Sequence, residues 1–254
     1  MKPEALRSLL EAVQAGGVDV EQAFAKLREL PFRDLGYAKI DHHRALRCGA
    51  PEVVYGETKT PEELAGIATE LASRGANLLV TRVDATQAKA IQDAVPAASY
   101  EARARAVVLL QGPQPEAPPK PVLVICAGTS DLPVALEAKL TAEVLGNRVE
   151  LLCDVGVAGL HRLLAHGEKL REAGVLVVVA GMEGALPSVV AGLVDRPVIA
   201  VPTSVGYGAA LSGFTALMGM LTSCAPGLSV VNVDNGFGGG YAAAKINRLS
   251  IPSK

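Results

Sequence analysis

Three short apolar segments in the second half of the chain constrain the fold more than any other feature. They cover residues 175–180, 197–201 and 228–233, and each leads into a loop of Gly, Ser, Thr, Pro or Asn and then a helical pattern of small residues. Uninterrupted apolar runs of this length are typical of strands that helices cover on both faces. Two similar segments precede them after residue 121. We therefore predict an α/β fold in which residues 122–254 form a three-layer αβα domain around a parallel sheet.

A proline-rich stretch, residues 111–121, separates this domain from the rest of the chain. Its eleven residues include five prolines, which cannot pair inside a sheet or continue a helix. We predict an extended linker and a domain boundary here. Ahead of it, residues 36–110 predict a small α/β domain. Residues 1–35 predict an arm of two short helices that packs on another subunit or on the main body.

The composition excludes several classes of partner. The 254 residues carry a formal net charge of −2, which offers no basic surface for nucleic acid. No segment reaches the roughly 18 apolar residues that a membrane helix needs. The first residues, with Glu4 soon after Lys2, are not those of a signal peptide. Four cysteines without Cys-x-x-Cys spacing indicate reduced thiols, so we expect a cytoplasmic protein.

Two side chains are the candidates for catalysis. Glu183 follows a predicted buried strand in a loop of Gly, Met and Ala. There it is either partly desolvated, with a raised pKa suited to proton transfer, or a solvated loop charge. Cys224 stands before Ala225-Pro226-Gly227, where a helix must end. It is either a nucleophile or, like most cysteines, a buried structural residue.

Two stretches are candidates for binding an anion. Residues 127–131 follow a predicted strand and open a helix, so Ser130 or Asp131 is a helix N-cap or part of an anion site made with the loop amides. In residues 236–240, four of five are glycines, which packing alone explains poorly. We predict a loop there whose backbone approaches a phosphate or another subunit. Neither a GxGxxG nor a Walker A pattern is present, which disfavours an ordinary dinucleotide fold or P-loop.

Further motifs carry a resemblance to known families. Residues 122–250 resemble the aminoimidazole-ribonucleotide (AIR) carboxylase fold, in the Ser130-Asp131 loop, Ala180-Gly181-Met182-Glu183, Pro197-Val198-Ile199-Ala200-Val201-Pro202, and the glycine-rich stretch into Ala242-Ala243-Ala244-Lys245-Ile246. The whole chain resembles more closely the LarB family of pyridinium-3,5-biscarboxylic acid mononucleotide synthases, which serve nickel-pincer cofactor biosynthesis. That resemblance rests on Tyr37-Ala38-Lys39-Ile40-Asp41, Arg44, Arg47, Gly49, residues 51–56, Thr58-Lys59-Thr60 and, most specifically, residues 221–227 (Leu-Thr-Ser-Cys-Ala-Pro-Gly).

The resemblance implies an enzyme that adds CO2 to C5 of the pyridinium ring of nicotinic acid adenine dinucleotide and cleaves its phosphoanhydride to release AMP. Cys224 would add to the ring as a thiolate, and Glu183 would remove the C5 proton. Mg2+ would assist the hydrolysis with Asp131 as its candidate ligand, and no organic cofactor is expected. The substrate-binding residues that the resemblance implies are Ser130, Asp131, Ser188, Thr203, Gly206, Asn235, Gly236, Gly238, Gly239, Arg44, Arg47 and Lys59.

Two other functions stay open. Purine-pathway carboxylases of this fold resemble one another in an Ala-His-Arg-Thr-Pro motif after the second strand, whose His transfers a proton. Here residues 153–159 read Cys-Asp-Val-Gly-Val-Ala-Gly instead. This departure makes an aminoimidazole-ribonucleotide carboxylase or mutase the second candidate. A non-enzymatic nucleotide-binding protein, which would bind the dinucleotide without consuming it, is the third.

Residues 208–221 predict how the protein assembles. They form a pattern that is apolar on nearly every face of a helix, with Gly and Ala at close spacing. Such a helix must be covered by protein, and small residues allow another subunit to approach closely. Related carboxylases are octamers, so the resemblance implies a homo-octamer with these helices around the central axis. The N-terminal domains would lie outside, and Cys224 would lie near a subunit boundary.

Overall fold

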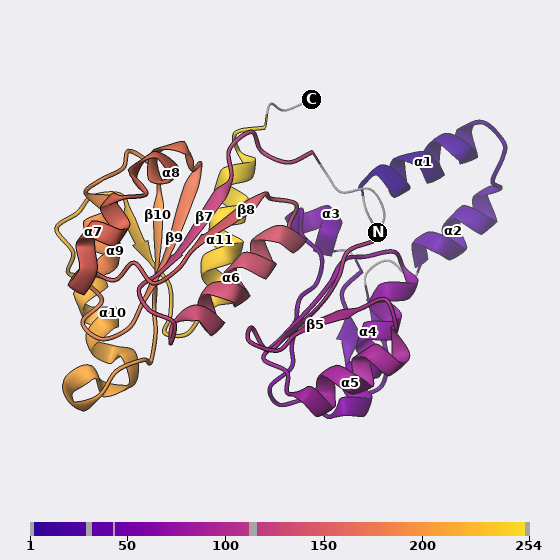
Figure 1. Cartoon of the computed structure of the whole chain (residues 1–254). Helices are drawn as coiled ribbons and strands as arrows, with labels where there is room; N and C mark the ends of the chain where they lie inside the picture. The colour runs from indigo at the N-terminus through magenta and orange to yellow at the C-terminus, as the bar shows by residue number, and fades with distance from the viewer. Residues whose placement is uncertain (1–2, 29–31, 43, 112–115, 252–254) are drawn as a thin grey trace. The chain divides into compact units, whose positions relative to one another are not determined.

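The structure, a computed structural model, describes residues 3–28, 32–42, 44–111 and 116–251. The chain divides into two compact units, residues 1–113 and 114–254, both drawn in Figure 1. The boundary between them falls inside the proline-rich stretch predicted as a linker, of which residues 112–115 lie outside the described part of the chain.

The second unit is built on a five-stranded parallel sheet. Its strands, in the order β11-β10-β9-β7-β8, are β7 (Val122–Cys126), β8 (Val149–Leu152), β9 (Val175–Ala180), β10 (Val198–Pro202) and β11 (Leu228–Val230). Strands β7, β9 and β10 are buried along their whole length. Ile125 of β7 lies opposite Leu152 of β8 and Val178 of β9. The predicted parallel α/β fold is confirmed.

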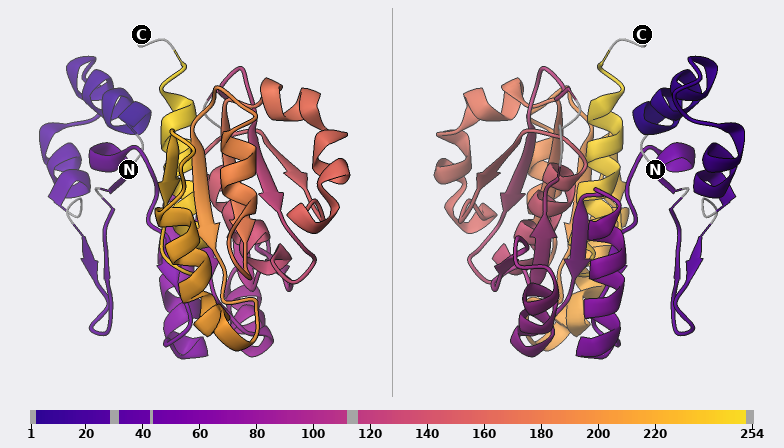
Figure 2. Two further views of the ribbon diagram at one scale, coloured as in Figure 1. Left: turned by 90° about the vertical axis from the view of Figure 1, so that its left-hand side faces the viewer. Right: turned by 90° about the vertical axis from the view of Figure 1, so that its right-hand side faces the viewer.

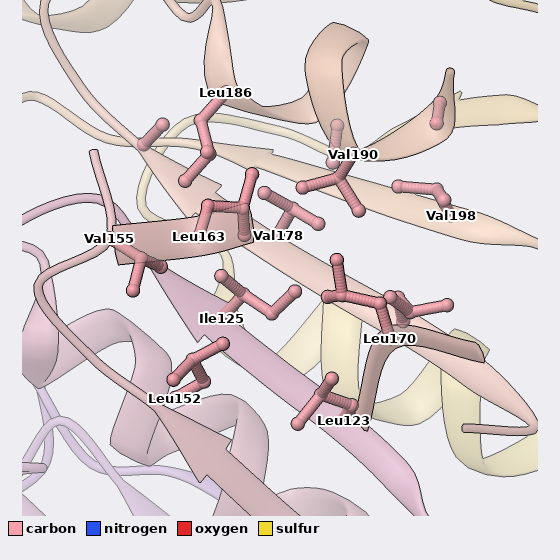
Figure 3. Packing of buried hydrophobic residues seen from close by; sticks show 14 of the residues in the cluster. Leu123, Ile125, Leu152, Val155, Leu163, Leu170, Val178, Leu186, Val190 and Val198 are labelled. Atoms are coloured by element: carbon pink, nitrogen blue, oxygen red, sulfur yellow. The ribbon is translucent and has the colours of Figure 1, made fainter. Parts of the chain in front are cut away.

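Helices cover the two faces of this sheet with side chains of different size. On one face lie α6 (Leu132–Val144) and α11 (Gly236–Arg248), which contribute mainly alanines to the core (Figures 1 and 2). On the other face lie α7 (Leu160–Leu164), α8 (Gly167–Glu172), α9 (Leu186–Ala191) and α10 (Phe214–Leu221). There the leucines Leu163, Leu170 and Leu186 pack toward Ile125 and Val178 of the sheet (Figure 3). The core is thus built from small side chains on one face of the sheet and from larger ones on the other.

The glycines of residues 236–240 form the first turns of α11, so the prediction of a loop there is wrong. A Cβ on Gly236 would lie 2.2 Å from the carbonyl oxygen of Val134, and a Cβ on Gly240 would lie 2.2 Å from that of Ala138. Both of these oxygens belong to α6. Without side chains, α11 can approach the backbone of α6 at van der Waals distance, which explains the glycines by packing.

The segment of residues 208–221 is not one helix. It consists of a 3-10 turn, η2 (Gly208–Gly213), followed by α10. Leu211 and Ser212 have left-handed backbones, with φ of 46° and 52°, and Gly213 follows with φ of 91°. Left-handed residues cannot continue a right-handed helix, so α10 starts anew at Phe214. Strand β11 also ends earlier than predicted, at Val230 rather than at residue 233.

The first unit holds a four-stranded sheet in the order β3-β4-β6-β5. Strands β3 (Val54–Tyr55) and β4 (Leu78–Thr81) are parallel, and β6 (Ala106–Leu109) is antiparallel to β4 and to β5 (Ser99–Glu101). Helices α4 (Pro61–Ser73) and α5 (Ala85–Ala94) complete the core with the fully buried Leu64 and Ile91. Ahead of this sheet come α1 (Pro3–Gln14), α2 (Val20–Arg28), a small hairpin of β1 (Arg33–Asp34) and β2 (Lys39–Ile40), and α3 (Arg44–Cys48). The 3-10 turn η1 (Val157–Gly159) belongs to the second unit, where it lies between β8 and α7.

Helices long and apolar enough to cross a membrane are absent from the described ranges.

One added methyl group at Gly240 should destabilise the second unit. In Gly240→Ala the new Cβ would meet the backbone oxygen of Ala138 at 2.2 Å. We expect the free energy of unfolding to fall by about 1–3 kcal/mol, the range typical of overpacked cores. Urea denaturation followed by circular dichroism measures this loss. Gly192→Ala is the matched control, since its Cβ would come no closer than 3.5 Å to a neighbour; equally small effects of the two substitutions would contradict a tight α6–α11 contact.

Candidate functional site

A pocket opens at the carboxyl edge of the parallel sheet. From β7 the chain passes to β8 on one side, whereas β9 lies on the other side, so the strand order reverses between β7 and β9. Loops that leave the sheet at such a reversal diverge and form a crevice, the usual ligand site of open α/β sheets. The pocket has a volume of about 290 Å³, and loops after four strands line it, with Gly128, Ser130, Asp131, Gly156, Arg162, Glu183 and Val205 among its residues.

Asp131 joins the loops that follow β7 and β10. Its Oδ1 accepts a hydrogen bond of 2.7 Å from Thr203 Oγ1, and its Oδ2 accepts one of 3.0 Å from the Gly128 amide. Thr203 is fully buried and Asp131 is 4% exposed. Gly181, in the loop after β9, passes close by, because a Cβ there would lie 2.7 Å from Thr203 Oγ1. The hydrogen-bonded pair of Asp131 and Thr203 therefore holds together the loops that follow β7, β9 and β10.

The environment of Asp131 sets its protonation. Burial raises the pKa of this carboxyl, although hydrogen bonds from Thr203 and Gly128 favour the ionised form and lower the pKa in part. Asp131 stands at the N-cap position of α6, as one of the two alternatives predicted, but its side chain makes no capping hydrogen bond to the helix. Ser130, beside it, is exposed and lines the pocket. Asp131 thus acts mainly as a tie between loops.

Glu183 stands on a tight turn at the other side of the pocket. Met182 and Gly184, its neighbours, have left-handed backbones with φ of 52° and 71°. The Gly184 amide donates to the Gly181 carbonyl at 3.0 Å, and the Met182 amide donates to the Val205 carbonyl at 2.8 Å. The Glu183 side chain is exposed within this chain. The predicted desolvation of Glu183 is therefore wrong for a single chain, since the turn presents the carboxylate to the open side of the pocket.

Helix α10 packs directly against this turn. A Cβ on Gly219 would lie 2.4 Å from the carbonyl oxygen of Glu183. Gly184 approaches α10 in the same way, with a Cβ position 2.6 Å from the carbonyl oxygen of Ala216. The position of Glu183 is thus coupled to that of α10.

Arg162 is a pocket residue that the sequence analysis did not single out. Its Nη1 lies 2.7 Å from Asp154 Oδ2, and Asp154 itself has a left-handed backbone with φ of 58° directly after β8. Gly159 leaves room for the guanidinium, because a Cβ there would lie 2.6 Å from Arg162 Nε. In the sequence, residue 162 follows the helical pattern of an ordinary amphipathic surface. Only the fold shows that Asp154 turns it toward the pocket.

Cys224 lies away from this pocket. It follows α10 and precedes β11, so it comes before the amino end of its strand, and its side chain is exposed. The alternative of a buried structural cysteine is wrong. Ser188 on α9 bonds Ser223 at 2.7 Å between the two Oγ atoms, which places Ser188 beside Cys224 rather than beside Glu183. Neither Ser188 nor Cys224 is among the residues that line the pocket.

The amides at the start of α11 already have acceptors within the chain. Asn235, the N-cap, accepts a hydrogen bond from the Gly238 amide at 2.8 Å, and the buried Glu137 accepts one from the Phe237 amide at 3.1 Å. A carboxylate thus occupies the helix N-terminus where a phosphate was expected, next to Gly236 and Gly239. Gly206 lies at the far side of the Met182 turn, in a loop where a Cβ would meet Ala210 at 2.5 Å.

The other expected substrate-binding residues belong to the first unit. Arg47 Nη2 lies 2.7 Å from Asp41 Oδ2, Arg44 is half-buried, and the Lys59 carbonyl accepts a hydrogen bond from Gln87.

A metal site built from protein ligands is not found in the ranges that the structure describes, since they hold no suitable group of three His, Cys, Asp or Glu side chains. Asp131, the expected Mg2+ ligand, already accepts hydrogen bonds at both of its oxygens. The residues of this chain therefore do not fit a Mg2+ ion held by the protein alone.

Two protein families match the chain in succession. Residues 32–111 match the LarB/PurE-like N-terminal domain, and residues 121–253 match AIR carboxylase. Together these two matches cover almost all of the sequence beyond the first helices.

Similar proteins divide into two groups. The uncharacterized protein MJ0165 of Methanocaldococcus jannaschii is 37% identical over 96% of this chain and 97% of its own length. N5-carboxyaminoimidazole ribonucleotide mutases match only about half of the chain. The one from Pyrococcus horikoshii is 32% identical over 52% of this chain and 76% of its own length, and the one from Methanocaldococcus jannaschii is 34% identical over 50% and 79%. The chain thus belongs to the LarB-like family, in which a LarB/PurE-like N-terminal domain precedes an AIR carboxylase domain.

Proposed function

We propose that this carboxylase-type enzyme acts on nicotinic acid adenine dinucleotide, carboxylates C5 of its pyridinium ring with CO2, and cleaves the phosphoanhydride to release AMP. The product is pyridinium-3,5-biscarboxylic acid mononucleotide, for nickel-pincer cofactor synthesis. The observation that carries the proposal is the exposure of Cys224 in a LarB-like chain. An exposed thiol can reach a substrate ring, whereas a buried one cannot.

The chemistry needs a nucleophile because C5 of a pyridinium ring does not attack CO2. The Cys224 thiolate forms an S–C bond to a ring carbon, and the π electron pair of the ring moves onto the ring nitrogen, which makes the ring a neutral, electron-rich enamine. C5 then forms a bond to CO2. Glu183 takes the C5 proton, and the electrons of that C–H bond restore the aromatic ring as the thiolate leaves. Water attacks the phosphoanhydride in the hydrolytic step, and AMP departs.

Within one chain Cys224 and Glu183 are not brought to one pocket, so the proposal also concerns assembly. The surface around η2 and α10, which we call the α10 surface, exposes five large apolar side chains: Tyr207, Leu211, Phe214, Met218 and Leu221. Monomeric proteins rarely expose a contiguous patch of this kind. We propose a homo-octamer in which this surface contacts neighbouring copies and a neighbour's Cys224 completes the pocket.

A second candidate function is that of an aminoimidazole-ribonucleotide carboxylase or mutase, which the similarity to the mutases favours. Against it stands the segment of residues 153–159, which lacks the Ala-His-Arg-Thr-Pro motif. In its place Asp154 orients Arg162. Arginine suits the carboxylate or phosphate of either substrate, so the substrate has to be determined by assay.

The deciding assay incubates the pure protein with nicotinic acid adenine dinucleotide, bicarbonate and Mg2+, and reads the product masses. A carboxylated mononucleotide together with AMP supports the proposal. Carboxylation of aminoimidazole ribonucleotide in a parallel assay would support the second candidate, and binding without turnover would leave a nucleotide-binding protein. We propose that any Mg2+ is carried by the substrate phosphates; activity that survives complete chelation with EDTA would remove the metal from the scheme.

Cys224→Ser should lower the rate of carboxylation by about 10³-fold or more, because removal of a covalent nucleophile has effects of this order. The variant should still fold and bind the dinucleotide. Mass spectrometry of the product measures the loss. Cys48→Ser, at a half-buried cysteine of the first unit, is the control. Carboxylated product formed by Cys224→Ser at the wild-type rate would rule out the covalent scheme.

Arg162→Ala should raise KM for the dinucleotide about 10- to 100-fold, since a hydrogen bond to a charged group contributes roughly 1.5–3 kcal/mol. Steady-state kinetics with the mass assay measure KM and kcat separately. Arg148→Ala, which removes an exposed arginine of the same unit outside the pocket, should leave KM unchanged. Identical KM values for the two variants would exclude Arg162 from substrate binding.

Phe214→Asp should break the octamer into smaller species, because a charge on the α10 surface cannot be buried between subunits without a partner. Light scattering at micromolar concentration measures the mass of the assembly. Leu249→Asp, at an 83% exposed leucine near the end of α11, should leave the mass unchanged. A stable wild-type monomer under these conditions would contradict the proposed assembly.

A further inference from the structure

One edge of the sheet in the first unit gathers charged and aromatic side chains that the proposed chemistry does not use. Strands β3 and β4 are parallel and β6 is antiparallel to β4, so the end of β3, the end of β4 and the start of β6 meet there. Tyr55, Arg82 and Arg105 occupy these three places. Glu57 follows Tyr55 in the same loop. We call these four residues the arginine-pair cluster.

Both arginines have left-handed backbones, with φ of 57° at Arg82 and 51° at Arg105. They face each other across the edge: the Arg105 carbonyl accepts a hydrogen bond from the Val83 amide at 2.8 Å, and Arg105 Nη2 donates to the Arg82 carbonyl at 3.4 Å. A glycine would adopt these angles with less strain. The conformation of the two turns therefore does not explain why both residues are arginines. Residues with strained backbones are frequent at ligand sites.

The charges of the cluster leave an excess on the positive side. The Glu57 carboxylate accepts a hydrogen bond from the Tyr55 hydroxyl and lies 4.0 Å from Arg82 Nη1. The Tyr55 hydrogen bond and then the two arginines lower the pKa of Glu57. Two guanidinium groups therefore act on one carboxylate. Of the neighbouring carboxylates, Asp84 is engaged as the N-cap of α5, and Glu101, opposite Ala106, accepts a hydrogen bond from the Arg103 amide.

The framework that carries the cluster is rigid. The buried Gln87 side chain donates hydrogen bonds to the carbonyl oxygens of Gly56 at 3.0 Å and of Lys59 at 2.7 Å. It thereby ties the loop of Glu57 to α5, which begins just after Arg82. The same loop ends in a capping box between Thr60 and Glu63 at the start of α4. A site held in this way needs little ordering when a ligand binds.

We propose that Arg82 and Arg105 bind the phosphate of a nucleoside monophosphate, whose base stacks on the ring of Tyr55. Guanidinium groups present paired N–H donors that match phosphate oxygens. Tyr55 is 47% exposed, and its ring centroid lies 5.8 Å from the Arg82 guanidinium, so a base on the ring and a phosphate at the arginine lie within the span of one nucleotide. Glu57 is the internal anion that such a phosphate would displace. The site lies wholly in the first unit and does not depend on the proposed carboxylation.

The test measures binding of AMP to the full chain by equilibrium dialysis, in an Arg162→Ala background that weakens binding in the pocket of the second unit. Arg82→Gly and Arg105→Gly should each weaken AMP binding at least 10-fold. Their melting temperatures should hold or rise, because glycine relieves the left-handed strain. Glu57→Gln should bind AMP several-fold more tightly, since the competing anion is gone. Lys89→Ala, at an exposed lysine of α5 that pairs with Asp93, is the matched control and should change nothing.

Several results would overturn the site. These are unchanged AMP affinity in both glycine variants, adenosine binding as tightly as AMP, and weaker binding in Glu57→Gln. Inorganic phosphate should bind more weakly than AMP, and equal affinities would remove the role of Tyr55. If a glycine variant fails to fold, Arg82→Lys and Arg105→Lys keep the charge but not the paired donors, and wild-type affinity in both would equally refute the proposal.

Discussion

A buried carboxylate, Asp131, holds the candidate site of the second unit together. Its two oxygens take hydrogen bonds from a hydroxyl 72 positions further along the chain and from an amide three positions before it. A carboxylate that is 4% exposed is tolerated only when its oxygens have hydrogen-bond partners. The loops after β7 and β10 therefore have to keep their positions relative to each other. The strand between them, β9, carries the Glu183 turn. The placement of the candidate base thus depends on a hydrogen bond that it does not itself make.

The pocket and the α10 surface are connected by a direct backbone contact. Glycines on both sides allow the Glu183 turn and α10 to touch through backbone atoms. The same helix exposes large apolar side chains on its outer side and ends one turn before Cys224. A neighbouring molecule that covers α10 would therefore shift or desolvate Glu183 as well. In that case the surroundings of the candidate base Glu183 and the access to Cys224 would both depend on assembly.

The architecture of the second unit could be read from its sequence because buried parallel strands are continuous apolar runs, and short loops leave little choice of connection. The same reasoning located Ser130, Asp131 and Glu183 in loops after β7 and β9, which do line one pocket. It failed where a contact joins distant segments. The glycines of α11 contact carbonyl oxygens of α6 about 100 residues away in the sequence. Arg162 was missed for another reason: Asp154 is only eight residues away, but its left-handed backbone has no signature in the sequence. Cys224 was identified by motif, but its separation from Glu183 within one chain follows from the direction of α10, which no single residue reveals.

The close fit of α11 against α6 also has a consequence for how the protein folds while it is being synthesised. The first helix of the second unit and its last helix share one face of the sheet, and the Phe237 amide bonds to Glu137 across 100 residues. While a ribosome is still making residues up to about 235, that face lacks half of its cover, and the apolar side chains of β7, β9 and β10 stay open on it. Contacts between such distant segments form late and slowly. This face of the sheet is therefore completed only after α11 has been synthesised, and until then its apolar side chains stay exposed.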